Sequence, residues 1–345
     1  MKHGGDILSY QHLYDGQIID FSSNINPLGY PKILDTIIPE VLGSLTAYPD
    51  IHYRVLRTAI SEYLGCQPDE VLVGNGSMEI LEHFCREAQR IVVCIPCFIE
   101  YIERAQIYRK KVKKIRLPDG FRCSTALFGN ELQRGDVVIL GNPNNPTGLR
   151  IAEDELLELQ QLAEEQQAFL LLDEAFFEFC VEDYDSVRLL HGKENICVIR
   201  AATKFFGLPG IRLGYAYATQ AIAEQYAASA LPWRINAIAD AAGRAIFRET
   251  AYIECSKALI REQRHEMFSE LQKIDSIKVF PTHTNFILIK LLYTTEDELF
   301  QQLLRHGLLI RKASSFEGVD RSYIRLAVKD QKSNRKLIET LNRCV

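Results

Sequence analysis

Residues 137–148 read VVILGNPNNPTG, a short apolar run joined directly to a turn rich in Asn, Pro and Gly. An apolar run of this length, bounded by turn residues, is typical of a strand buried on both faces. Further runs of this kind are residues 91–95, 169–172 and 196–199. Helical patterns lie between them, most clearly over residues 153–167, where leucines recur at spacings of three. Strands that alternate with amphipathic helices predict an α/β domain around a mainly parallel sheet.

Polar or conformationally special residues follow all four apolar runs. They are Pro96 to Phe98, Asn142 to Gly148, Asp173 to Phe176 and Arg200 to Lys204. In an open parallel sheet, ligands bind beyond the carboxyl ends of the strands. The four strand ends therefore predict one ligand site at that edge of the sheet.

The composition is that of an ordinary globular protein. The chain has 345 residues with 47% hydrophobic content, enough for a sizeable core and, by length, for two domains. Its 40 Lys and Arg face 45 Asp and Glu, so no broad positive field can gather nucleic acid or an anionic membrane surface. The first residues lack the apolar stretch of a signal peptide, and no segment approaches the about 18 apolar residues that span a bilayer. We therefore expect a cytosolic protein.

The nine cysteines are odd in number and scattered, which fits reduced thiols better than a disulfide framework. Cys94 and Cys97 form one CxxC motif, but Cys94 falls inside the apolar run of residues 91–95 and no second pair supplies further ligands. We therefore expect no metal site.

The last third of the chain changes pattern. Residues 249–273 are helical in periodicity, and residues 279–280, 286–291 and 323–328 are strand-like with a helix between them. This order predicts a smaller α+β domain. We expect an N-terminal arm over residues 1–30, a large domain over residues 31–230 and a small C-terminal domain over residues 231–345.

Three motifs, taken in their order and spacing, resemble the fold-type I aminotransferases that use pyridoxal 5'-phosphate (PLP). They are NPNNPTG at residues 142–148, Asp173-Glu174-Ala175, and Thr203-Lys204 with Arg212 eight residues later. The resemblance covers nearly the whole chain. It implies a PLP-dependent enzyme whose large domain holds a mainly parallel seven-stranded sheet, followed by the smaller C-terminal α+β domain.

The resemblance also implies how the cofactor is held. Lys204 would carry the PLP aldehyde as a Schiff base, and Asp173 would keep the ring nitrogen protonated. Asn145 would donate to the phenolate oxygen, and Phe98 would stack on the ring. Phe176 stands where many aminotransferases carry a tyrosine bonded to that oxygen, so the ring of this cofactor would have one hydrogen bond fewer.

The cofactor phosphate needs its own donors. The turn before a predicted helix contains Gly76, Ser77 and Met78, and backbone N–H groups at a helix N-terminus form an anion site. By resemblance these three residues line the phosphate cradle, and Thr203 and Arg212 add side-chain contacts. Tyr48 matches a tyrosine that reaches the phosphate of the neighbouring subunit's cofactor, which implies a homodimer with shared active sites.

The N-terminus resembles one branch of these enzymes more narrowly. HGGDI at residues 3–7, followed by DFSSNINPLG at residues 20–29, is similar to the threonine-phosphate decarboxylase family of cobalamin biosynthesis, which also shares Phe176. The substrate-binding residues implied are His3, Gly4, Asn24, Asn145, Arg311 and Arg325. Arginine suits a substrate with a carboxylate and a phosphate, because its planar fork makes paired charge-assisted bonds. The sequence leaves open which arginine would meet which anion.

The implied reaction is PLP-dependent decarboxylation of L-threonine O-3-phosphate to (R)-1-amino-2-propanol O-phosphate, for the nucleotide loop of a corrinoid. Serine phosphate is an alternative substrate, because one methyl group in a pocket is worth only ~1–3 kcal/mol. A transaminase for histidinol phosphate or a related amino acid is an alternative reaction, because it shares all the cofactor residues. A non-catalytic PLP-binding regulator would require a DNA-binding segment or a damaged site, and the sequence displays neither.

Overall fold

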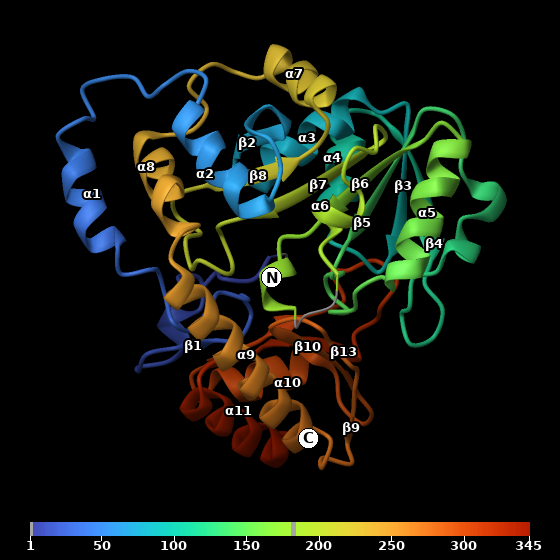
Figure 1. Ribbon diagram of the computed structural model, residues 1–345. Helices are drawn as coiled ribbons and strands as arrows, with labels where there is room; N and C mark the ends of the chain where they lie inside the picture. Colours follow the sequence, from blue (N-terminus) through green and yellow to red (C-terminus); the bar gives the residue numbers. More distant parts are fainter. Residues whose placement is uncertain (1–2, 181–183) are drawn as a thin grey trace.

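The computed structural model describes residues 3–180 and 184–345 and is built around two sheets (Figure 1). The larger sheet has seven strands in the order β2-β8-β7-β6-β5-β3-β4. Their bounds are β2 (Val71–Asn75), β3 (Arg90–Ile95), β4 (Lys111–Arg116), β5 (Asp136–Gly141), β6 (Phe169–Asp173), β7 (Ile196–Ala201) and β8 (Leu213–Tyr217). Only β8 runs antiparallel to its neighbours, so the predicted seven-stranded, mainly parallel sheet is confirmed.

Helices cover both faces of this sheet. Alternate side chains of each strand point to opposite faces, so Val138 and Leu170 pack on one side while Ile139 and Leu171 pack on the other. The helices of this region are α1 (Leu34–Leu42), α2 (Arg54–Leu64), α3 (Ser77–Glu87), α4 (Glu100–Ile107), α5 (Glu153–Glu165), α6 (Ser186–Leu189), α7 (Gln220–Ser229) and α8 (Ala237–Ile246). Because both faces are buried, the central strands are continuous apolar runs, which is why the sequence revealed them.

The sequence did not reveal β2, β4 and β8, and the patterns of β4 and β8 show why. The outermost strand β4 reads KVKKIR, and lysines on an edge strand discourage pairing with another chain. Strand β8 contains Gly214, where the backbone of Gly76 and Ser77 approaches so closely that a Cβ would collide with it. Neither strand is therefore a plain apolar run.

The second sheet has the order β12-β13-β10-β9 and is antiparallel throughout. Its strands are β9 (Ile277–Val279), β10 (Phe286–Leu291), β12 (Arg311–Lys312) and β13 (Tyr323–Ala327), and the accompanying helices are α9 (Thr250–Leu271), α10 (Glu296–Leu304) and α11 (Gln331–Cys344). The predicted α+β pattern is confirmed, although β9 begins two residues before the expected strand and ends at Val279. The division of the chain at residues 30 and 230 stays a prediction.

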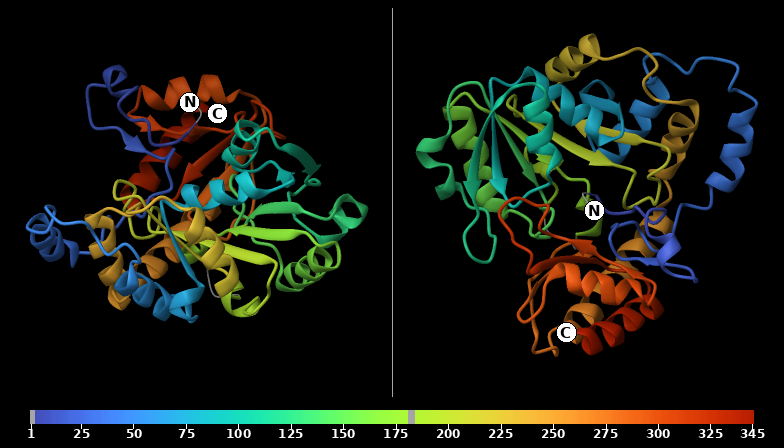
Figure 2. Two further views of the ribbon diagram at one scale, coloured as in Figure 1. Left: turned by 90° about the horizontal axis from the view of Figure 1, so that it is seen from above. Right: turned by 180° about the vertical axis from the view of Figure 1, so that it is seen from behind.

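The N-terminal segment joins the C-terminal sheet region although it is far away in sequence. Strand β1 (Ile19–Asp20) pairs in parallel with β11 (Leu308–Leu309). In the views from above and behind, the blue N-terminal segment accordingly lies beside the orange and red C-terminal region (Figure 2). Short 3-10 helices complete the elements: Gln11–Leu13, Pro68–Glu70, Thr125–Leu127, Gly129–Glu131 and Phe177–Phe179. Among the described residues, no helix combines the length and apolarity needed to cross a membrane.

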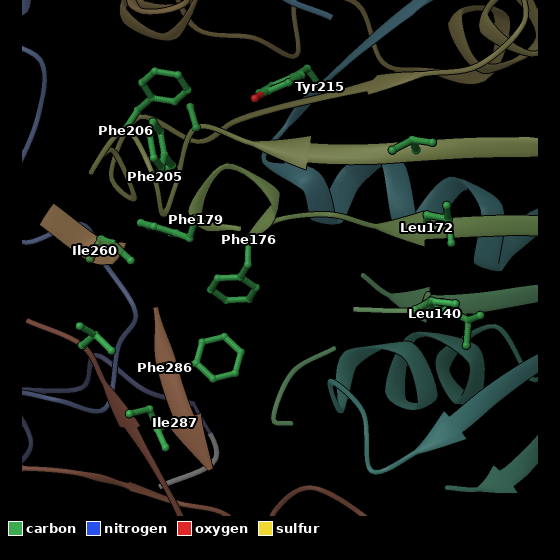
Figure 3. Packing of buried hydrophobic residues seen from close by; sticks show 14 of the residues in the cluster. Leu140, Leu172, Phe176, Phe179, Phe205, Phe206, Tyr215, Ile260, Phe286 and Ile287 are labelled. Carbon is green, nitrogen blue, oxygen red and sulfur yellow. The ribbon is translucent and has the colours of Figure 1, made fainter. Parts of the chain in front are cut away.

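The core continues from the large sheet to the small one. Phe176, which follows β6, packs edge to face on Phe286 of β10 with 5.0 Å between the ring centroids (Figure 3). Phe179, Phe205 and Phe206 extend the same cluster. This packing fixes the distance between the two sheets, and the cavity described next lies between them.

Candidate active site

A cavity of about 240 Å³ lies at the carboxyl ends of the central strands, between the two sheets. All of the residues singled out from the sequence line it except Gly76 and Tyr48: His3, Gly4, Asn24, Ser77, Met78, Phe98, Asn145, Asp173, Phe176, Thr203, Lys204, Arg212, Arg311 and Arg325. The rule that ligands bind at this edge of a parallel sheet therefore located the cavity correctly.

Lys204 lies in the loop between β7 and β8 and faces the cavity. Burial, together with the nearby charges of Arg325 and Arg212, lowers the pKa of its amine to about 8, against an opposing contribution from Asp20. A lysine amine is a nucleophile only when it is neutral, so this environment prepares Lys204 to react with a carbonyl compound near neutral pH.

Asp173 ends strand β6, and each of its carboxylate oxygens has one donor. Tyr101 donates its hydroxyl to Oδ2 at 2.8 Å, and the backbone N–H of Ala175 donates to Oδ1 at 3.1 Å. Burial raises the pKa of Asp173, and these two hydrogen bonds oppose that effect. The carboxylate can therefore act as the counter-ion of a protonated ring nitrogen.

The turn before α3 forms an anion cradle at the N-terminus of a helix. Gly76 has a φ of 75°, and a Cβ there would collide with the guanidinium of Arg212, so this position requires glycine. Arg212 itself has a φ of 61°, and its carbonyl accepts a hydrogen bond from Gly76 N at 2.9 Å. A strained residue with a positive side chain beside a helix N-terminus fits a phosphate group.

Two buried arginines lie opposite each other on adjacent strands of the second sheet. Arg311 of β12 and Arg325 of β13 are register partners and are only 3% and 5% exposed. Arg325 donates to Asn145 Oδ1 at 2.5 Å and to the carbonyl of Ser22 at 2.8 Å, while Arg311 donates to Ser315 Oγ at 2.6 Å. Burial lowers the pKa of Arg325 to about 9, with a further contribution from Arg311. Like charges directly opposite each other destabilise a sheet, so this pair favours bound anions.

The N-terminal arm closes one side of the cavity. His3 Nε2 lies 3.1 Å from Glu100 Oε1, and Gly5 N donates to Ser22 Oγ at 2.9 Å. Gly4 packs against the carbonyl of Ser22 so closely that a Cβ would collide with it.

Asn24 also lines the cavity. It is buried, and its side-chain oxygen has no hydrogen-bond partner among the residues that the structure describes. A buried amide oxygen without a partner is costly unless a ligand donates to it.

Two predicted residues take no part in lining this cavity. Gly76 lies directly behind it, as the N-cap of α3. Tyr48 is 78% exposed and stacks on Trp233 with 4.5 Å between ring centroids. In one copy of the chain Tyr48 therefore contributes nothing to the cavity, and its assignment to a neighbouring subunit's site stays a prediction.

The structure adds residues that sequence reasoning missed. Tyr101, Ser22, Ser23 and Phe316 also line the cavity. Ser22 and Ser23 bind the Asp20 carboxylate through their hydroxyl groups, which shapes the turn under the arm. Tyr101 follows Phe98 by three residues at the start of α4, and that spacing was the only signal that could have revealed it.

The chain is similar to known proteins over almost its whole length. Residues 16–341 match the family described as aminotransferase class I and II. A protein of Caldanaerobacter subterraneus subsp. tengcongensis, provisionally named threonine-phosphate decarboxylase, is 40% identical over 99% of this chain and 95% of its own length.

Two solved structures are similar in fold as well as sequence. The histidinol-phosphate aminotransferase from Clostridium acetobutylicum is 36% identical, with a TM-score of 0.90 over 94% of this chain and 98% of the other. The L-threonine-O-3-phosphate decarboxylase from Porphyromonas gingivalis is 26% identical, with a TM-score of 0.84 over 94% of this chain and 98% of the other. Both reactions considered from the sequence are therefore represented among its relatives.

Proposed function

The chain belongs to the aminotransferase class I and II family of PLP-dependent enzymes, and from that premise we propose that it decarboxylates L-threonine O-3-phosphate to (R)-1-amino-2-propanol O-phosphate. The observation that carries the proposal is the buried pair Arg311 and Arg325, directly opposite each other beside Lys204. Such a pair suits one small substrate with two anionic groups. The 40% identical relative provisionally named threonine-phosphate decarboxylase supports the same reading.

Each part of PLP has a suitable residue around the cavity. Lys204 would hold the aldehyde, Asp173 the protonated ring nitrogen and Asn145 the phenolate oxygen. The phosphate would be held by Gly76, Ser77, Met78, Thr203 and Arg212, while Phe98 and Phe176 would border the ring. When bound, PLP supplies an acceptor for the electron pair that loss of CO2 leaves on the substrate.

The protein's own contribution is orientation and proton transfer. Arg311, Arg325, His3, Gly4 and Asn24 would bind the carboxylate and the phosphate, and so determine which bond to the substrate Cα stands perpendicular to the ring. That geometry selects between loss of CO2 and loss of the Cα proton. Because the pKa of Lys204 is about 8, its amine can carry a proton near neutral pH and deliver it to Cα after CO2 has left.

We also propose that the enzyme is a homodimer in which Tyr48 reaches the partner's cofactor phosphate. Tyr48 stacks on Trp233, and Val55 and Leu231 are 57% and 75% exposed nearby in the chain. Exposed apolar side chains of this size favour an interface. A second copy would cover them and bring the phenol to a phosphate.

The test of the reaction uses the PLP-loaded enzyme and carboxyl-labelled threonine phosphate without any oxo-acid. Sustained release of labelled CO2 over many turnovers supports the decarboxylase. Serine phosphate and unphosphorylated threonine in parallel assays measure the contribution of the methyl group and of the phosphate. If no CO2 is released and product forms only after an oxo-acid is added, the proposal is wrong.

The second candidate is a transaminase for histidinol phosphate, and it rests on the solved structure with 36% identity and a TM-score of 0.90. It would use the same cofactor residues. Its signature is a stoichiometric requirement for an oxo-acid acceptor. As part of the first proposal, the aminopropanol phosphate would serve the nucleotide loop of a corrinoid. The enzyme would act in the cytoplasm.

A further inference from the structure

We propose that Tyr101 is a positioning residue that holds the Asp173 carboxylate as an anion, with one oxygen lone pair turned toward the cofactor ring. The proposal rests on the proposed role of Asp173 and is independent of whether the enzyme decarboxylates or transaminates. Tyr101 belongs to the first turn of α4 and is 2% exposed. Its hydroxyl donates to Asp173 Oδ2 at 2.8 Å, although 72 residues separate the two in sequence.

The surroundings of Asp173 explain why a second donor is needed. The side chain is buried, and burial favours the neutral carboxylic acid over the charged carboxylate. The charge of Glu174, the next residue, pushes the pKa of Asp173 in the same direction. A protonated carboxyl group could not serve as counter-ion for a ring N–H, because it would no longer carry the balancing charge. Donation from Tyr101 and from Ala175 N opposes both effects.

The two donors also fix the orientation of the carboxylate. One donor sits on each oxygen, so rotation of the carboxylate plane would break both hydrogen bonds together. Tyr101 stays a donor, because burial and the negative charge of Asp173 raise the pKa of its phenol well above the ordinary value. Each oxygen keeps acceptor capacity for a further partner, and the cavity is on that side.

The start of α4 also positions Phe98, the side chain that would stack on the cofactor ring. The ring of Phe98 meets the ring of Tyr101 edge to face, with 5.6 Å between centroids and 86° between planes. Tyr101→Phe preserves this ring contact and removes only the hydroxyl. The substitution therefore separates the proposed role from simple packing.

The chain offers a matched control in Tyr215→Phe. Tyr215 is also buried, and its hydroxyl also donates at 2.8 Å to a buried carboxylate, Glu178 Oε1. Tyr215 does not line the cavity. A general effect of losing a buried tyrosine hydroxyl would appear equally in both variants.

The experiment measures the protonation of the ring nitrogen directly. Wild type, Tyr101→Phe, Tyr215→Phe and Asp173→Asn are loaded with ring-15N PLP, and the 15N chemical shift is followed as pH rises. Asp173→Asn provides the reference for a ring nitrogen that has lost its counter-ion. PLP dissociation constants of the apoenzymes and the steady-state constants of the holoenzymes complete the set.

In Tyr101→Phe we expect the ring nitrogen to lose its proton at lower pH than in wild type, toward the behaviour of Asp173→Asn. Loss of one donor to a buried charge predicts roughly 10- to 100-fold weaker PLP binding. We expect kcat to fall while KM stays near wild type, because the substrate groups are untouched. Tyr215→Phe should keep the wild-type 15N profile even if its thermal stability falls.

A wild-type 15N profile and PLP affinity in Tyr101→Phe would overturn the proposal, and so would equal effects in Tyr101→Phe and Tyr215→Phe. Failure of the decarboxylation assay leaves this test intact, because the nitrogen signal requires only bound PLP. Conversely, a colourless wild-type protein that takes up no PLP would overturn both proposals and would be recognised before any variant is made.

Discussion

Arg200 of β7 and Arg325 of β13 are both buried arginines on strands of this protein, and their surroundings are opposite. Arg200 is the last residue but one of β7, is 2% exposed, and donates to Glu174 Oε2 at 2.8 Å and Asp185 Oδ1 at 2.7 Å. Burial alone would lower its pKa, but the charges of Glu174 and Asp185 outweigh burial and raise it. Arg325 faces the cavity, and burial lowers its pKa to about 9.

The carboxylates account for this difference. Glu174 also accepts hydrogen bonds from Asn142 at 3.0 Å and Ser186 at 2.5 Å, so the Arg200 network joins three strand ends with nearly every polar atom satisfied. Within residues 3–180 and 184–345, Arg325 makes no ion pair with a carboxylate. A buried charge with a full set of partners maintains the fold, whereas one that lacks a counter-ion is prepared for a ligand.

The largest expected effect comes from breaking the satisfied network. Arg200→Met leaves Glu174 and Asp185 without their cation, and breaking a buried ion pair predicts a loss of about 3–5 kcal/mol in the free energy of unfolding. Chemical denaturation of the apoenzyme measures it. The control is Arg188→Met, an exposed arginine on the neighbouring helix α6, for which we expect a change within about 0.5 kcal/mol. Equal losses in the two variants would contradict the comparison.

A smaller effect, and on a different quantity, is expected at the cavity. Arg325→Met should leave the stability of the apoenzyme unchanged or raised, because it removes a buried charge that lacks a counter-ion. Binding of threonine phosphate should weaken by about 2 kcal/mol or more, roughly 30-fold, because an anion loses its paired donor. Scanning calorimetry of the PLP-free protein measures the stability, and the KM of the PLP-loaded enzyme measures the binding of threonine phosphate. Arg321→Met, at an exposed arginine of the same region, is the control. A destabilised Arg325→Met with normal affinity would reverse the roles we assign.

The smallest expected effect is on the pH dependence of PLP capture by Lys204, and it sharpens the comparison of Arg325 with Arg200. Because the pKa of Lys204 is lowered to about 8, its amine loses its proton as pH rises through that value. Capture of PLP by the apoenzyme should therefore accelerate from pH 7 to about pH 9 and then level off. In the same sense, the unfolded chain binds more protons than the folded one between about pH 8 and 10.5, so the stability of the apoenzyme rises with pH there.

Arg325 contributes to that lowered pKa and Arg200 does not. The midpoint of PLP capture should therefore move to higher pH in Arg325→Met. Stopped-flow measurement of capture rates between pH 6 and 10 tests it. A wild-type midpoint near 10, or an unchanged midpoint in Arg325→Met, would show that the cavity charges do not influence the lysine.

Most of the central sheet could be predicted from the sequence, because strands buried on both faces are continuous apolar runs. This held for β3, β5, β6 and β7, whose ends also carry Phe98, Asn145, Asp173 and Lys204. The edge strand β4 was missed because lysines interrupt its apolar pattern. The arm was assigned to the site by resemblance alone, because nothing in its local pattern shows that β1 pairs with β11 near the other end of the chain.

By itself the sequence determined the order of strands and helices and the identity of the residues at the strand ends, because side-chain periodicity and turn chemistry are local properties. Only the tertiary structure decided that Arg311 faces Arg325 in register, that Ser22 holds Arg325 from 303 residues away, and that Tyr101 reaches Asp173. These contacts depend on how two sheets pack around Phe176 and Phe286. Burial and the partners it provides are what set the pKa values of the site, and both exist only once the chain has folded.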